Sequence, residues 1–405
     1  MTKFLIYLFL SLRLKIILWK NYYSNLEHRN ILQNMPAKNY FAENFLTKTL
    51  LPFPYPVQLL KIAPWDKFIE QNGYLDLSRK LNLKVYTDFS SIKNLWEEFS
   101  PCDSVFDLWE VRQAFWEGYK FDPYFISLVR GKGTREENIA LLPLWFNSDP
   151  PNAGGGDDAL ASDGQKYVWY GSNWPEDNVF FSKNDELIPL LLVIAPKPLE
   201  LACIRPKKEY SFLKEFPGVS NEEEQKYFLD ISHTDTLENY LKKLKKKKRY
   251  NLKRDRKKIL KLKPQTVINE KSHIEELFRL SIKRFREQFP DEPLEHSAFE
   301  DNRRKNVFRT LINNAGRYQF RLISTIIKGC VEAVEFGLVY KKTYYALNAG
   351  ANISKYSGIG VYSNLLVVED AINLGCEKID FLEGDNNWKE SWHLDHFYQY
   401  QYKKL

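Results

Sequence analysis

The same order of predicted elements occurs twice along this chain of 405 residues. In each half, the hydrophobic pattern predicts two helices, three strands, another helix and a closing strand. The first set covers residues 92–99, 105–119, 124–130, 139–146, 167–170, 186–194 and 199–204, and the second covers 274–289, 303–314, 320–327, 331–340, 343–348, 361–374 and 378–382. Helices that alternate with strands exclude an all-helical or all-strand fold. We therefore predict an α/β fold with a mixed sheet, made of two domains of similar architecture.

Composition and cysteine spacing narrow the class of protein further. Hydrophobic residues make up 44% of the chain and aromatic residues 15%, which favours packed cores over disorder. The four cysteines lie far apart and form no C-x-x-C pair. This spacing disfavours a zinc site or a disulfide scaffold and suits a reducing compartment. We expect no metal and a cytoplasmic location.

One segment carries the positive charge of the chain. The net charge is +7, yet residues 242–263 contain fourteen Lys and Arg against the single acid Asp255, so the rest of the chain is mildly acidic. Apolar residues recur through the same segment, at Leu241, Leu244, Leu252, Ile259 and Leu262. They would give a helix one buried side. We expect a long basic helix that links the two halves.

Three cations of this segment are candidates for substrate binding. Arg249, Lys253 and Arg256 are spaced three and four residues apart and would share one helix face. That face suits the phosphates of a nucleotide- or lipid-linked acceptor, or an anionic membrane surface. Clustered Lys and Arg also suit nucleic acid, although no recognisable nucleic-acid module accompanies them. A solvated helix face is the plainest alternative.

The first 50 residues form an extension with its own pattern. The apolar run Phe4–Leu12 is too short to span a membrane once Arg13 and Lys15 interrupt it. We expect residues 1–50 to be either disordered or an interfacial helix, with peripheral contact at the inner membrane surface as one consequence. A further interpretation is that Met35 is the true start.

A glycine-containing loop precedes the predicted helix of the second half. The run Lys355-Tyr-Ser-Gly358-Ile-Gly360 follows a strand and leads into that helix. Glycines let backbone N–H groups approach an anion, and a helix N-terminus adds partial positive charge. We predict a diphosphate site made by Lys355, Gly358, Ile359, Gly360, Val361 and Tyr362. The plainer interpretation is a tight turn from strand to helix.

Residues 320–392 resemble the GNAT acyltransferase superfamily. Its signature loop reads Arg/Gln-x-x-Gly-x-Gly/Ala, and here Lys355, Gly358 and Gly360 stand at the corresponding positions. The CelD-like branch, which is related to the FemAB peptidyltransferases, is similar in two further patterns. Its basic helix is matched by the segment 249–256, and its closing pattern by Gly375, Asp380, Gly384 and Lys389. Two departures are that a lysine replaces the commoner Arg or Gln, and that the strand 343–348 carries no acid.

The resemblance implies a fold, a donor and a reaction. It implies tandem GNAT-like domains joined by the basic helix, with a degenerate domain over residues 51–230 and a catalytic domain over 231–405. Acyl-CoA, most simply acetyl-CoA, would bind only to the second domain. The reaction would be N-acyl transfer to an amine, with an amino sugar of a cell-surface polysaccharide as one acceptor class.

Acyl transfer to an amine needs a base, a positioned acyl carbon and donors for the oxyanion. Glu383, at the end of the strand 378–382, is our candidate general base. Asp380 and Lys389 are the other catalytic candidates, with Lys389 holding an anionic group of the acceptor or the oxyanion. Glu335 is a candidate for substrate binding.

Two other function classes fit the same residues. A FemAB-like enzyme would use aminoacyl-tRNA and a peptidoglycan precursor, and its basic helix would contact nucleic acid. A non-catalytic protein would bind a membrane or nucleic acid through that helix and consume no thioester.

Overall fold

The computed structural model describes residues 55–56, 81–131, 135–149, 165–172, 174–290, 297–384, 388–389, 392 and 394–404. Our interpretations of residues 1–50 therefore lie outside the described residues. The chain divides into two compact units. The first comprises the described parts of Met1–Asp88, Phe125–Leu142 and Ser182–Lys197, and the second those of Phe89–Tyr124, Pro143–Phe181 and Pro198–Leu405. The predicted domain boundaries, 51–230 and 231–405, remain a prediction.

The first unit contains antiparallel strands and a short helix. Strand β2 (Asn82–Tyr86) pairs with β1 (Tyr55–Pro56) and with β3 (Asp122–Arg130). The unit also holds the first part of β4 (Glu137–Asn147), and α9 (Ile188–Ile194), which follows η3 (Asp185–Leu187). Burial of nearly every residue of α9 explains why so apolar a segment folds here.

The second unit holds most of the elements. Its helices are α6 (Phe89–Phe99), η1 (Val105–Asp107), α7 (Trp109–Tyr119), η4 (Lys208–Glu215), α10 (Leu237–Lys243), α11 (Lys246–Leu260), η5 (Lys271–His273), α12 (Ile274–Gln288), η6 (Ala298–Glu300), α14 (Asn302–Asn313) and α15 (Ile359–Asn373). Its strands are β5 (Lys166–Trp169), β7 (Leu199–Ile204), β8 (Val219–Asp230), β9 (Gln265–Ile268), β10 (Gln319–Ile327), β11 (Cys330–Tyr340), β12 (Thr343–Ala351), β13 (Lys378–Glu383) and β14 (Asp395–Lys404). The short strand β6 (Phe181–Ser182) lies at the border between the units.

These strands form one mixed sheet in the order β5-β7-β14-β8-β13-β12-β11-β10-β9. The pairs β5·β7 and β12·β13 are parallel, and the other neighbours are antiparallel. The predicted repeat is present, because β3, β4, β5, α9, β7 and β10, β11, β12, α15, β13 follow the same order. In each set the third strand pairs in parallel with the strand after the helix. The expected α/β class and the tandem architecture are therefore confirmed.

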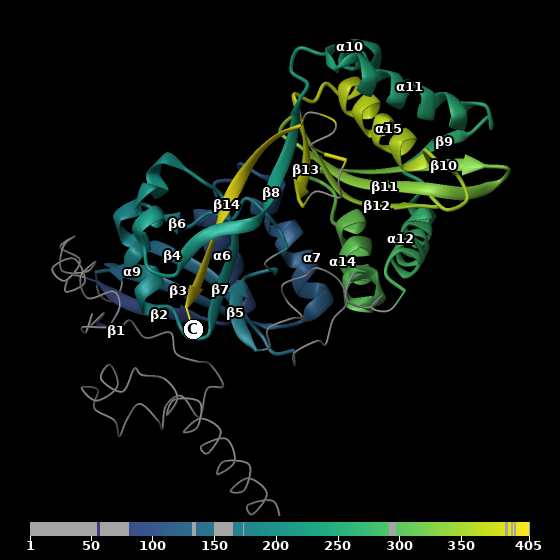
Figure 1. The fold of residues 1–405 in the computed structure, drawn as a ribbon. Coiled ribbons are helices and arrows are strands. Elements are labelled where there is room, and N and C mark those ends of the chain that lie inside the picture. The colour runs from purple at the N-terminus through teal and green to yellow at the C-terminus, as the bar shows by residue number, and fades with distance from the viewer. Residues whose placement is uncertain are drawn as a thin grey trace, which may run out of the picture. The chain divides into compact units, whose positions relative to one another are not determined.

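Helices cover both faces of β10–β12 (Figure 1). Side chains alternate along these strands, so each face has its own core. On one face Phe336 packs against Phe308 of α14, and a Cβ at Gly350 would lie 2.7 Å from the backbone of Leu277 in α12. On the other face lie α15 and, outside it, α11, with Ile259 of α11 in one core with Ile359.

The basic segment differs from our expectation in one respect. It forms two helices, α10 and α11, because Leu244 is extended and Lys245 begins a new helix. Leu244 is buried, which ties the break to the core, and Leu252 and Ile259 keep α11 on the protein as predicted. Among the described residues, no helix has the length and apolar character needed to cross a membrane.

Candidate active site

Two parallel strands of the second half separate where the site begins. The register of β12 with β13 covers only Thr343–Tyr345 against Lys378–Asp380. Beyond it, β12 continues to Ala351 and leads into α15, while β13 continues to Glu383 along β8. The inner edge of β12 therefore offers backbone groups that β13 does not pair, beside a helix N-terminus.

The N-terminus of α15 has the features expected of an anion site. Gly358 precedes the helix with φ +92°, a conformation that favours glycine, and a Cβ there would lie 3.1 Å from Asp255. The amides of Ile359 and Tyr362 already donate to Tyr356 and Gly358. Gly360 and Val361, in the first helical turn, are the residues whose amides have no intrahelical acceptor. A Cβ at Gly360 would meet nothing closer than 3.9 Å, so there is room beside this first turn.

In the first half, the strands that correspond to β12 and β13 are β5 and β7, and a later segment of the chain lies beside β7 where β5 ends. Beyond Tyr167 and Leu199, β5 gives way to Asn178, which forms a parallel bridge with Ile204 of β7. The Asn178 amide donates to the Cys203 carbonyl, and its side chain accepts from buried Arg112 at 2.6 Å. The expectation that the first half holds no cofactor stays a prediction.

A bulge at the end of β13 aims Glu383 into the site. The register of β13 with β8 shifts between Asp380 and Glu383, and Leu382 has φ +61°. Asp380 holds this bulge, because its Oδ1 accepts the Leu382 amide at 3.0 Å. Lys389 Nζ donates to the carbonyls of Leu382 and Glu383 at 3.1 and 2.9 Å. The three predicted catalytic residues are thus brought together, with Asp380 and Lys389 positioning the strand end.

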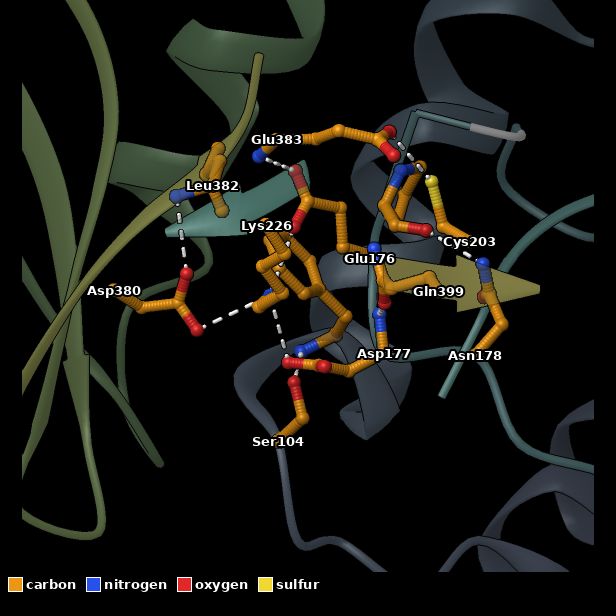
Figure 2. A network of polar contacts seen from close by, with 12 residues as sticks. Ser104, Glu176, Asp177, Asn178, Cys203, Lys226, Asp380, Leu382, Glu383 and Gln399 are labelled. Atoms are coloured by element: carbon orange, nitrogen blue, oxygen red, sulfur yellow. Dashed lines mark hydrogen bonds and ion pairs between the residues drawn. The ribbon is translucent and has the colours of Figure 1, made fainter. Parts of the chain in front are cut away.

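A fully buried lysine lies at the centre of this site (Figure 2). Lys226 of β8 pairs through Nζ with Glu176 at 2.8 Å, Asp177 at 3.0 Å and Asp380 at 3.1 Å. These carboxylates raise the pKa of Lys226 well above its usual value, although burial alone would lower it. Burial raises the pKa of Glu176, and Lys226 lowers the pKa of Asp177 against the effect of burial.

Glu383 adjoins this network and has the properties of a base. Its amide donates to Glu176 at 2.7 Å, and its Oε2 accepts from the Cys203 thiol at 3.3 Å, while its buried Oε1 has no hydrogen-bond partner in the described structure. Burial, then the neighbouring Glu176 and Glu222, raise the pKa of Glu383 to about 8. A carboxyl with that pKa can exchange a proton near neutral pH.

Backbone strain gathers at the same place. Asp177, Cys203 and Leu382 all have positive φ, at 56°, 53° and 61°. Such conformations are uncommon for residues other than glycine and concentrate at functional sites, where the surrounding structure must hold them. In Figure 2, Asp177 lies below Glu176 and Cys203 lies to its right. Three of the eleven described non-glycine residues with positive φ thus adjoin the charged cluster.

The other predicted residues lie elsewhere. Lys355 pairs with Glu332 at 2.5 Å, close to the start of α15. Lys253 pairs with Glu238 at 2.6 Å, Arg256 lies between Glu238 and Glu369, and Arg249 donates to the Lys242 carbonyl. These three cations thus have partners inside the protein, and their role in substrate binding stays a prediction.

Glu335 lies on β11, two strands away from β13. It is opposite Ile323 in the register, so its side chain shares the face on which Ile323 packs with Leu365 of α15. Burial raises the pKa of Glu335 to about 8, with Arg284 opposing that effect. Its role toward substrate stays a prediction.

Glu335 should make the stability of the folded chain depend on pH. Its pKa is higher in the folded state than the usual 4.5, so its favourable contribution is complete below pH 4.5 and is lost as pH rises to about 8. Between these values the loss is up to about 1.4 kcal/mol per pH unit. Urea unfolding of Glu335→Gln should show a flatter pH dependence than the native chain. The exposed control Glu215→Gln should keep the native slope, and equal slopes for all three proteins would contradict the prediction.

Sequence reasoning missed the cluster around Glu383. Lys226 lies in a strand whose sequence, VSNEEEQKYFLD, has polar residues where a buried strand usually has apolar ones. Glu176 and Asp177 follow a proline and were not singled out. The signal that was available is the adjacent acid pair after the strand 167–170, at the place where the second half has its predicted cofactor loop.

Comparison with known proteins identifies part of the chain. Residues 246–390 match the model of a family described as acetyltransferase (GNAT) domain. No curated protein matches the chain.

Among solved structures, a conserved protein of unknown function from Bacteroides thetaiotaomicron is similar at 12% identity, over 79% of this chain and 99% of its own, with a TM-score of 0.44. FemX is similar at 10% identity over 79% and 97%, with a TM-score of 0.49. A tandem GNAT protein from the clavulanic acid biosynthesis pathway is similar at 7% identity over 80% and 98%, with a TM-score of 0.44.

Proposed function

We propose that this chain, in which residues 246–390 form an acetyltransferase (GNAT) domain, transfers an acyl group from acyl-CoA to an amine. The observation that carries the proposal is the pair of separating strands β12 and β13. One leads to the first-turn amides of Gly360 and Val361, and the other ends at Glu383, a half-buried carboxyl with a pKa of about 8. A phosphate-binding end and a proton-accepting end thus border the same strand edge.

The residues present fit a diphosphate-bearing donor. Gly358 allows the turn, Gly360 leaves room above the helix N-terminus, and the unpaired edge of β12 can hydrogen-bond an extended amide chain. When bound, acyl-CoA supplies the acyl group as an activated thioester. We also propose that the chain belongs to the CelD-like branch of the superfamily, which is related to the FemAB peptidyltransferases.

Glu383 has the central chemical role. As the carboxylate, it takes the proton that the acceptor ammonium must lose before its nitrogen can attack the acyl carbon. The new C–N bond forms as the C–S bond breaks. The nitrogen then loses its second proton to solvent to give the neutral amide, and the protonated carboxyl can return its proton to the departing thiolate. Lys226, Asp380 and Lys389 act by holding the strand end that carries Glu383. The acceptor we favour is an amino sugar.

The direct test is transfer of a radiolabelled acetyl group from acetyl-CoA to a panel of amines that includes glucosamine. The purified full chain should label at least one amine, and ribonuclease should not change the rate. If transfer instead requires aminoacyl-tRNA and is abolished by ribonuclease, the FemAB-like function replaces this one. If acetyl-CoA neither binds nor raises the unfolding temperature, the proposal is wrong.

Gly360→Leu should abolish acetyl-CoA binding while the chain stays folded. The added side chain enters open space and is compatible with a helix, so it should block the amides without straining the fold. We expect at least about a tenfold loss of affinity by titration calorimetry, since charge-assisted hydrogen bonds to phosphate are lost. Gly316→Leu is the matched control, because a Cβ there also meets nothing closer than 4.0 Å. Equal affinities for both variants would contradict the assignment, and native protein should bind one acetyl-CoA per chain.

A further inference from the structure

One side of α11 presents positive charge that the protein does not neutralise. We call it the cationic face and define it by Lys246, Lys247, Lys253, Arg254, Lys257 and Lys261 around Tyr250. At about 100° per residue, all six cations lie within about 60° of Tyr250 on the helix circumference. The buried Leu252 and Ile259 lie on the opposite side, against the protein.

Four of these cations lack an acidic partner among the described residues. They are Lys246, Lys247, Lys257 and Lys261, whereas Lys253 pairs with Glu238, and Arg254 with Asp255. The only acid in α11 is Asp255, which is turned toward Gly358 on the protein side. A row of unpaired lysines over about 22 Å of helix is therefore left facing outward.

Apolar groups stand among these charges. Tyr250 is 67% exposed and Leu260 47%, and both belong to the few large apolar side chains that the described surface exposes this far. Tyr250 stands in an open hollow lined by Lys246, Lys247, Arg249 and Lys253. All the residues that line the hollow belong to α11, which in Figure 1 lies on the outer side of α15.

We propose that the cationic face of α11 docks on an anionic phospholipid surface. Lysines outnumber arginines five to one on this face, and a lysine is a point charge that suits many lipid phosphates rather than one fixed geometry. Arg254, the one arginine among the six cations of this face, has its guanidinium held by Asp255 at 2.9 and 3.2 Å, so its planar fork is already engaged. A tyrosine ringed by lysine stems matches the headgroup layer, where aromatic and snorkelling side chains concentrate. This proposal does not depend on the acyl-transfer function.

Vesicle sedimentation tests the proposal with the full chain. We expect binding to vesicles of phosphatidylcholine with phosphatidylglycerol, little binding to phosphatidylcholine alone, and loss of binding at high salt. Changing Lys246, Lys247, Lys257 and Lys261 together to Gln should weaken binding about fivefold per lysine, or several hundredfold in all. The matched control changes the four exposed lysines Lys208, Lys214, Lys271 and Lys328 to Gln and should bind nearly as well as the native chain. Tyr250→Ser should weaken binding without changing its salt dependence.

Three outcomes would overturn the proposal. In the first, the two quadruple variants bind vesicles equally, which would mean that binding depends on the net charge of the protein and not on the cationic face. Native protein could fail to bind the anionic vesicles at low salt. In the third outcome, transfer RNA binds the native chain tightly and binds the α11 variant weakly, while the anionic vesicles do not bind at all. That result would assign the cationic face to nucleic acid. Circular dichroism of each variant confirms that the helix is intact.

Discussion

Glu383→Gln is expected to lower kcat/KM for the active amine by about 10²–10⁴-fold, because the amide cannot accept the proton of the acceptor ammonium. The native chain should show kcat/KM rising with pH and levelling above about 8, since the ionised carboxylate is the active form and its pKa is about 8. The Gln variant should lose that inflection along with the rate. Steady-state kinetics across this pH range measure both effects in one experiment.

The control for this variant is Glu224→Gln, an exposed carboxyl on the neighbouring strand β8. It should keep both the native rate and the native inflection. Acetyl-CoA affinity should be unchanged in both variants, which separates loss of a base from loss of the donor site. A Gln variant that keeps the inflection near pH 8 would assign the base to another group.

The second half of the fold follows closely from the sequence because its elements are regular. The strands β10 to β13 and the helix α15 have strong alternation or helical periodicity, and their predicted ranges lie within a few residues of the observed ones. The strand β8 was missed, although it lies between β14 and β13 in the sheet. Three consecutive glutamates and a lysine give it no apolar pattern, and its burial comes from its two neighbours rather than from its own composition.

The residues of the candidate site that lie on one strand were predicted from the sequence. The residues that the fold brings to it from distant parts of the chain were missed. Glu383 and Asp380 belong to a strand end whose place beside the predicted cofactor loop is visible in the sequence. Lys226 meets Asp380 only because β8 and β13 pair across about 150 residues of chain. Glu176 reaches the same point from the other half. A charged residue in a single sequence is ordinarily taken as exposed, so a buried lysine leaves no local signal.

Lys226→Met should be the most destabilising single change in this region. It removes the cation that Glu176, Asp177 and Asp380 share and leaves Asp380 only the longer pair with Lys378 at 3.6 Å. Loss of one partner from a buried ion pair costs about 3–5 kcal/mol. In the native chain the raised pKa of Lys226 means that its contribution is complete below its usual value of 10.5 and is lost only as pH rises further. The contribution of Asp177, whose pKa is lowered, is present above its usual value of 3.8.

Urea unfolding at pH 7 therefore measures the full effect of Lys226→Met, and the difference from the native chain should shrink at acid pH as the carboxylates become protonated. Lys253→Met is the matched control, since its ion pair with Glu238 is about half exposed on both sides and should contribute less than about 1 kcal/mol. Adding Asp177→Asn to Lys226→Met should restore part of the lost stability, because one uncompensated charge is removed. Equal losses for the two lysine variants would mean that water reaches Lys226, and that the charge cluster does not hold Glu383 as proposed.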